Sequence, residues 1–256
     1  MKNILISAAL MAISLNGNAQ SAESKADQEK ANMKILAELG LPLPGSGIKL
    51  VPRALMNLPE DIIIQGQKEE KEYAEKGFIE KFTMRPKELL KIDETFANSN
   101  FIKEDMSHER STGLSPSISN LKLAFKFPNL SKSLMSSNGM HMLAATPMGG
   151  FHEEKGGWSG ASQFFTVNNI GTCSYDIMNV SVSNTATELA QEDVSYTINN
   201  KATVLLSPEG NEMSGYIYSL KWYDNENFHT LECANMNYSK QMNDDVIELA
   251  KKIDIS

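Results

Sequence analysis

The chain has 256 residues, 41% of them hydrophobic, and its 24 basic and 32 acidic side chains give a formal net charge of −8. Nucleic-acid phosphates and anionic lipid headgroups repel such a chain, and no basic cluster offsets the charge, so neither is an expected partner. The length suits one large domain or two small ones, and either can bury a hydrophobic core.

The first 19 residues have the pattern of a secretory signal peptide. Lys2 supplies a positive start, Ile4 to Leu15 are mostly apolar, and the small residues Gly17 and Ala19 stand at the −3 and −1 positions of a cleavage site. The apolar run is shorter than the roughly 20 residues of a transmembrane helix. We therefore expect residues 1–19 to be removed and the mature chain to be periplasmic or secreted, with no membrane span.

The next part of the chain predicts a linker and then a mainly helical region. Residues 20–58 are polar and rich in proline and glycine, with a short helix expected over 25–39. In the helical region, 59–128, helices are expected to start near Pro59 and Pro86, since proline is tolerated in the first turn of a helix.

Beyond these helices the composition favours strands. The sequence "LKLAFKF" at 121–127 alternates apolar and basic residues and predicts a half-buried strand. Residues 129–160, rich in glycine, serine and methionine, are expected to form a connecting loop. Residues 161–256 contain several alternating stretches joined by turns too short for parallel crossovers, which predicts an antiparallel sheet.

The last stretch of the chain predicts an amphipathic helix that docks on this sheet. Its apolar stripe consists of Met242, Val246, Leu249, Ala250 and Ile253. The sequence therefore predicts an α+β fold: a helical N-terminal part and an antiparallel β-sheet C-terminal domain with a docked C-terminal helix.

The only two cysteines predict a disulfide in the C-terminal domain. Cys173 and Cys233 would meet an oxidising compartment after export. Each shares a strand face with apolar residues, Tyr175 for the first and Leu231 for the second, so both should point into the core. The two strands must then be neighbours or face each other across that core, because a disulfide requires close Cα atoms.

The stretch "GMHMLAATPMGGFHEEKGGWSG", residues 139–160, carries two alternative hypotheses about a binding site. Glycines and aromatic residues at both ends of a charged tetrad are typical of a shaped recognition loop, although a tight connector with solvated charges fits as well. The residues of this possible recognition loop are Phe151, His152, Glu153, Glu154, Lys155 and Trp158.

The same stretch contains the soft thioether and imidazole ligands that suit copper(I). The candidate ligands are Met140, His141, Met142, Met148 and His152. The alternative is that the methionines fill irregular gaps in a core, which they do well. Copper is the only cofactor that the sequence suggests.

Short catalytic motifs are incomplete in this chain. His152 is not followed by the second histidine of H-E-x-x-H, and Ser159 misses the G-x-S-x-G elbow because Ala161 takes the last position. We therefore assign no catalytic residue. The sequence favours a non-enzymatic binding or interaction module of the cell envelope or secreted fraction, with a protein or glycan of the envelope or host as its partner. The alternatives are a periplasmic copper-binding protein and a secreted hydrolase with an unrecognised site.

Overall fold

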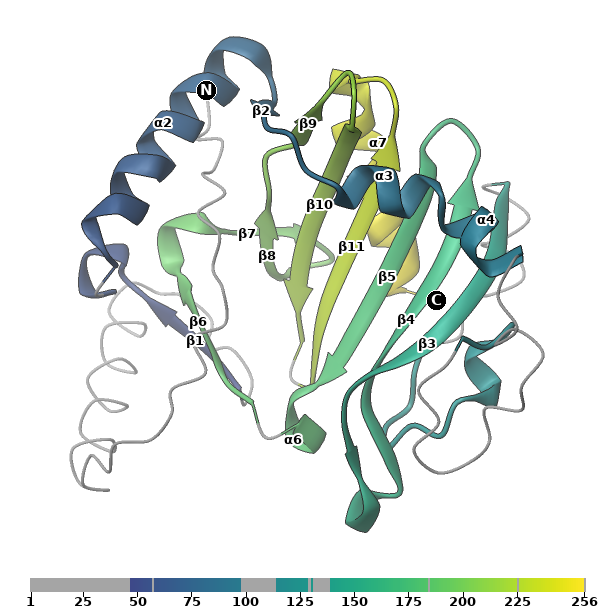
Figure 1. Cartoon of the computed structure of the whole chain (residues 1–256). Coiled ribbons are helices and arrows are strands. Elements are labelled where there is room, and N and C mark those ends of the chain that lie inside the picture. The colour runs from purple at the N-terminus through teal and green to yellow at the C-terminus, as the bar shows by residue number, and fades with distance from the viewer. Residues whose placement is uncertain are drawn as a thin grey trace, which may run out of the picture.

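The computed structural model describes residues 47–56, 58–97, 114–128, 130, 139–183, 185–224 and 226–255. The expected signal peptide at 1–19 and the expected short helix at 25–39 lie outside these residues. Among the described residues, no helix is both long and apolar enough to cross a membrane. The described chain has a mixed α+β fold, with a large mixed sheet and a C-terminal helix (Figure 1).

The helices and strands have the following bounds. The helices are α2 (Glu60–Lys76), α3 (Arg85–Leu90), α4 (Ile92–Ala97), α6 (Val180–Ser183) and α7 (Lys240–Asp254), and the 3-10 turns are η1 (Arg53–Leu55), η3 (Ile118–Asn120), η4 (Glu153–Lys155) and η5 (Gln191–Asp193). The strands are β1 (Ile48–Val51), β2 (Ile79–Glu80), β3 (Met140–His152), β4 (Gly157–Val167), β5 (Gly171–Asn179), β6 (Thr187–Ala190), β7 (Val194–Ile198), β8 (Lys201–Leu205), β9 (Glu209–Asn211), β10 (Gly215–Tyr223) and β11 (Asn227–Asn235).

The main sheet has nine strands, in the order β2-β9-β10-β11-β5-β4-β3, with β8 also paired to β10 and β7 paired to β8. Its pairs are antiparallel except β2–β9, and β1 forms a separate parallel pair with β6. The antiparallel pairing predicted for residues 161–256 is found in every described pair of strands within that range, but β1 and β2, from earlier in the chain, add parallel pairs, so the sheet structure is mixed. Both exceptions bring a strand that precedes α3 to a strand far along the chain, and such long connections allow parallel pairing where tight turns do not.

The connecting loop expected over 129–160 is also wrong in its second half. Met140–His152 form β3, which pairs with β4 in a long antiparallel hairpin. The sequence did not indicate this strand because β3 is an edge strand with an irregular register. The register shifts between Met142 and Ala144 and again between Met148 and Phe151. Such irregularities break the apolar alternation by which a strand is recognised in sequence.

The strand expected over 121–127 does not form. The segment has only an isolated parallel bridge between Leu123 and Trp158. Leu121, Leu123 and Phe125 nevertheless pack against the main core from this irregular segment. The alternating pattern therefore correctly predicted that one side of this segment is buried. Burial alone, however, does not supply the ladder of hydrogen bonds that defines a strand.

Two predicted helices are found where the sequence placed them. α2 starts directly after Pro59 and ends at Gly77, whose φ of 82° is the left-handed conformation that glycine adopts without strain. α7 docks on the sheet with its predicted stripe, since all five apolar side chains of that stripe are buried. Burying each large aliphatic side chain contributes about 1.5–3 kcal/mol, so this stripe fixes the helix firmly.

The two faces of the sheet carry different partners. On one, which we call the α7 face, α7 packs on the apolar side chains of β4, β5, β10 and β11. Over the other, the α3 face, α3 crosses β5, β11 and β10 and buries Leu89 (Figure 1). Residues that alternate along one strand thus meet the main hydrophobic core with α7 on one side, and a smaller apolar cluster around Leu89 together with polar residues on the other.

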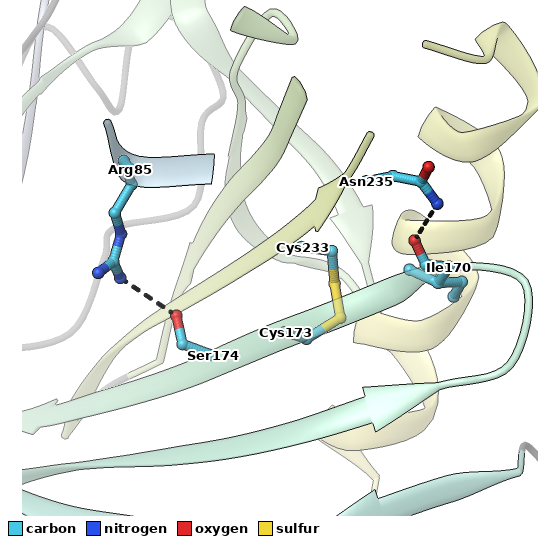
Figure 2. Close-up of a disulfide and its surroundings, with 6 residues drawn as sticks. All are labelled: Arg85, Ile170, Cys173, Ser174, Cys233 and Asn235. Atoms are coloured by element: carbon cyan, nitrogen blue, oxygen red, sulfur yellow. Dashed lines mark hydrogen bonds between the residues drawn. A yellow bond between two sulfur atoms is a disulfide. The ribbon is translucent and has the colours of Figure 1, made fainter. Parts of the chain in front are cut away.

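The predicted disulfide is confirmed and lies on the α7 face (Figure 2). Cys173 of β5 and Cys233 of β11 stand directly opposite each other, with Cα atoms 4.1 Å apart, and neither is exposed to solvent. The two strands are neighbours, as the prediction required. Phe165 on β4 and Tyr218 on β10 continue the same row on either side, so the bridge is at the centre of the core.

Replacing both cysteines with alanine should lower the free energy of unfolding by about 2–5 kcal/mol. The bridge joins two residues that are 60 positions apart in the sequence. Its loss raises the conformational entropy of the unfolded chain and leaves a cavity in the core. Urea denaturation followed by tryptophan fluorescence measures the change. The control is the parent protein unfolded with and without reductant, which should show a shift of similar size; an unchanged midpoint in the double variant would contradict the prediction.

Candidate functional site

The possible recognition loop is the end of the β3–β4 hairpin, and we call residues 151–158 the hairpin tip. β5 pairs with β4 only from Gly160 onward, so the tip extends past its neighbouring strand (Figure 1). The turn η4 reverses the chain, and Gly156 closes it with a φ of 81°, a left-handed conformation that favours glycine. The tip is therefore a tight, projecting turn at the end of a hairpin.

Three contacts hold the aromatic residues of the tip in place. The rings of Phe151 and Trp158 pack edge to face, with centroids 5.6 Å apart. The Lys122 Nζ atom lies 5.9 Å from the Phe151 ring centre, a cation–π geometry. The Trp158 N–H donates to the Lys122 carbonyl at 2.9 Å, which ties the tip to the irregular segment beneath it. Gly157 allows this approach, because a Cβ there would lie 2.6 Å from the Lys122 carbonyl oxygen.

The charged tetrad divides into two parts. Lys155 turns toward α6, where its Nζ donates to the carbonyls of Ser181 at 2.6 Å and Val182 at 3.1 Å. Glu153 and Glu154 are exposed, and Glu154 lies 3.5 Å from the His152 Nδ1 atom. A hydrogen bond from its own backbone N–H, with a smaller effect of nearby His152, lowers the pKa of Glu154. The tetrad therefore exposes two acids and one lysine whose Nζ atom is held by α6.

The five candidate copper ligands do not come together. Met140 is buried on the α7 face and Met142 packs near it, whereas His141 between them is exposed on the opposite side. Met148 accepts a hydrogen bond from Ser162 on the α3 face. At about 3.3 Å per residue, Met148 lies roughly 26 Å from Met140 along β3. His152 belongs to the tip. The alternation of side chains along one strand separates residues that are adjacent in sequence.

A buried chain of hydrogen bonds joins an acid, a histidine and a tyrosine. Asp224 Oδ2 lies 2.9 Å from His229 Nε2, and His229 Nδ1 lies 2.9 Å from the Tyr175 hydroxyl. Burial opposes ionisation of Asp224, but hydrogen bonds from His229 and from backbone N–H groups outweigh it and lower its pKa. His229 thus lies in the core, on the same strand as Leu231 and Cys233.

This order of groups resembles a hydrolytic triad, but its hydroxyl is out of reach of a substrate. Tyr175 has no exposed surface, and burial raises its pKa well above its usual range. The Trp222 ring stacks on His229 and donates from Nε1 to Asp254 Oδ1 at 2.8 Å, and Asp254 also accepts from Lys201. The chain of polar contacts therefore fastens the C-terminal end of α7 to the sheet.

A second polar group lies on the α3 face. Arg85, at the start of α3, donates from Nε to Glu232 at 2.8 Å. Its guanidinium also donates to Ser174 at 3.4 Å (Figure 2). Asp176 follows Ser174 on the same face of β5 and stands opposite Ser162. Asp176 Oδ1 is buried and has no hydrogen-bond partner. An uncompensated buried carboxylate oxygen is energetically costly.

The surroundings of Asp176 shift its pKa strongly. Burial is the main cause and raises the pKa to about 6, while the hydrogen bond with Ser162 and the charge of Arg85 oppose the shift. Sequence reasoning missed both this acid and the Tyr175–His229–Asp224 chain. Asp176 stands in an alternating strand where polar residues usually face solvent, and nothing in the local pattern shows that α3 covers part of that face.

No family model, curated protein or solved structure matches this chain. The argument about function therefore rests on the residues and their geometry.

Replacing Asp176 with asparagine should make the protein more stable above pH 6. The unfolded carboxyl ionises near pH 3.8, whereas the folded one keeps its proton to about pH 6. The parent therefore loses stability as the pH rises from about 4 to 6, by at most about 3 kcal/mol at 1.36 kcal/mol per pKa unit. Urea denaturation at pH 4 and pH 7.5 measures this. Asp245→Asn, at a half-buried position of α7, is the matched control. An Asp176→Asn variant with the same effect on stability at both pH values would contradict the assignment.

Proposed function

We propose that the chain is an exported binding protein that contacts a protein partner through the hairpin tip. The observation that carries this proposal is the way the tip is built: a projecting turn, fastened by the Phe151–Trp158 pair, by Lys122 and by Lys155, that holds two acids toward solvent. Export is supported by the signal-peptide pattern of residues 1–19 and by the Cys173–Cys233 bridge, which suits an oxidising compartment.

A fastened loop suits binding because ordering a mobile loop reduces affinity. Each side chain that must be immobilised on association costs about 0.5–1.5 kcal/mol, and the tip has much of this order already. Its half-buried Phe151 and Trp158 offer the kind of aromatic anchor that dominates many interfaces. Lys155 is exposed as well, but carbonyls of α6 hold its Nζ atom. The two acids outnumber it in the tetrad, and a partner with a basic surface complements them.

The proposal predicts that removing the two negative charges of the tip weakens partner binding by about five- to tenfold. The test places a photo-reactive benzoylphenylalanine at position 158 of the mature chain, residues 20–256, and exposes it to envelope and secreted fractions of the source cell. A discrete adduct is expected, and its yield should fall in the Glu153→Gln, Glu154→Gln double variant.

The matched control is the double variant Glu70→Gln, Glu75→Gln, which makes the same change in net charge on exposed positions of α2. It should leave the adduct yield unchanged. Equal losses in both double variants would show that only net charge matters, and the absence of any adduct from position 158 would remove the tip as the contact surface.

A further inference from the structure

A hollow of about 250 Å³ opens between α2, β10 and α7, away from the hairpin tip. Its inner wall is apolar and consists of Leu205, Leu206, Leu220, Val246 and Ile247. Tyr73 of α2 forms part of its outer wall. An apolar concavity with a few polar groups at one end is the usual form of a small-molecule site, although typical sites begin at about 300 Å³, so only a small ligand fits here.

The hollow exists because one edge of β10 is shared by two strands. β9 pairs with residues 215–217 and β8 with residues 220–223, so the backbone around Tyr218 and Ser219 lies between the two ladders. There the chain passes outward from β8 to β9, held by a hydrogen bond from the Leu206 N–H to the Ser219 carbonyl at 3.1 Å. α7 spans this gap on its own face of the sheet and closes one side of the hollow.

The hydroxyl group of Tyr218 is already hydrogen-bonded and is not available to a ligand in the hollow. The Tyr218 hydroxyl donates to the Ser239 carbonyl at 3.2 Å and accepts from the Ser239 N–H at 2.8 Å. Its ring and the neighbouring aliphatic side chains therefore present an apolar surface. A ligand must place an apolar group against this wall.

The mouth carries opposite charges one helical turn apart. Lys240 and Asp244 both line the hollow from the first two turns of α7, both are exposed, and Asn243 lies beside them. Within the described residues, neither Lys240 nor Asp244 makes an ion pair, either with the other or with a third group. Side chains at i and i+4 of a helix start about 5–6 Å apart, which leaves room for a small charged head between them.

We propose that the hollow binds a free α-amino acid with an aliphatic or aromatic side chain. The side chain packs against the leucines and Ile247, the α-carboxylate pairs with Lys240, and the α-ammonium group pairs with Asp244. A fatty acid or an aliphatic amine satisfies only one of the two charges, and a peptide of several residues or a long acyl chain exceeds the volume. This site is independent of the hairpin tip and does not depend on the partner proposed for it.

The test is calorimetric titration of the mature chain with L-leucine and L-phenylalanine. Two analogues of leucine lack one charge each: 4-methylpentanoate keeps the carboxylate and isoamylamine keeps the ammonium group. Both should bind at least tenfold more weakly than leucine, the loss expected for one charged hydrogen bond. No heat from any amino acid at about 10 mM, or equal affinity for leucine and both analogues, would overturn the proposal.

Three variants then test the placement of the ligand. Asp244→Asn and Lys240→Gln should each weaken leucine binding about tenfold, while Asp244→Asn leaves 4-methylpentanoate binding unchanged. Asp245→Asn, the adjacent acid, which does not line the hollow, is the matched control and should bind leucine normally. Ile247→Trp should abolish binding by filling the hollow. Leucine binding that survives Asp244→Asn and Lys240→Gln overturns the assignment even if the tryptophan variant fails to fold.

Discussion

The pairing of β5 with β11, locked by the Cys173–Cys233 bridge, is the interaction on which the rest of the molecule depends. It joins two groups of strands that are separate along the chain: β3, β4 and β5 on one side, and β8 to β11 on the other. The α7 helix depends on both groups, because its apolar stripe belongs to one hydrophobic core with residues from β4 and β5 as well as from β10 and β11. Without that junction the helix would have half a surface on which to dock.

Strand alternation at this junction separates apolar and polar roles. Cys173 and Tyr175 point toward α7, whereas Ser174 and Asp176, between and beside them, point toward α3. The α7 face therefore contains the disulfide and a stack of aromatic rings, and the α3 face contains the Arg85–Glu232 ion pair and a carboxyl whose ionisation is unfavourable. A one-residue slip of β5 would exchange these environments, so the bridge also fixes the register.

Both surfaces to which we assign binding lie where regular strand pairing stops. The hairpin tip begins beyond the end of β5, where β3 and β4 pair with each other and contact the segment around Lys122 and α6. The hollow beside α7 lies where β10 passes from pairing with β9 to pairing with β8. At these two places side chains lie at the surface, where a ligand or a partner can reach them.

The sequence alone determined the features that depend on local pattern. The apolar stripe of α7, the start of α2 after Pro59 and its end at Gly77, and the inward direction of both cysteines follow from spacing within a few residues. Tertiary structure decided what depends on partners far along the chain. It made β3 a strand despite its glycines, left 121–127 without a ladder, set β2 parallel to β9, and brought the charge of Arg85 near Asp176. Local patterns indicate which side of a segment is buried, but hydrogen bonds between strands, and the charge environment of a face, depend on which distant segment comes to lie against it.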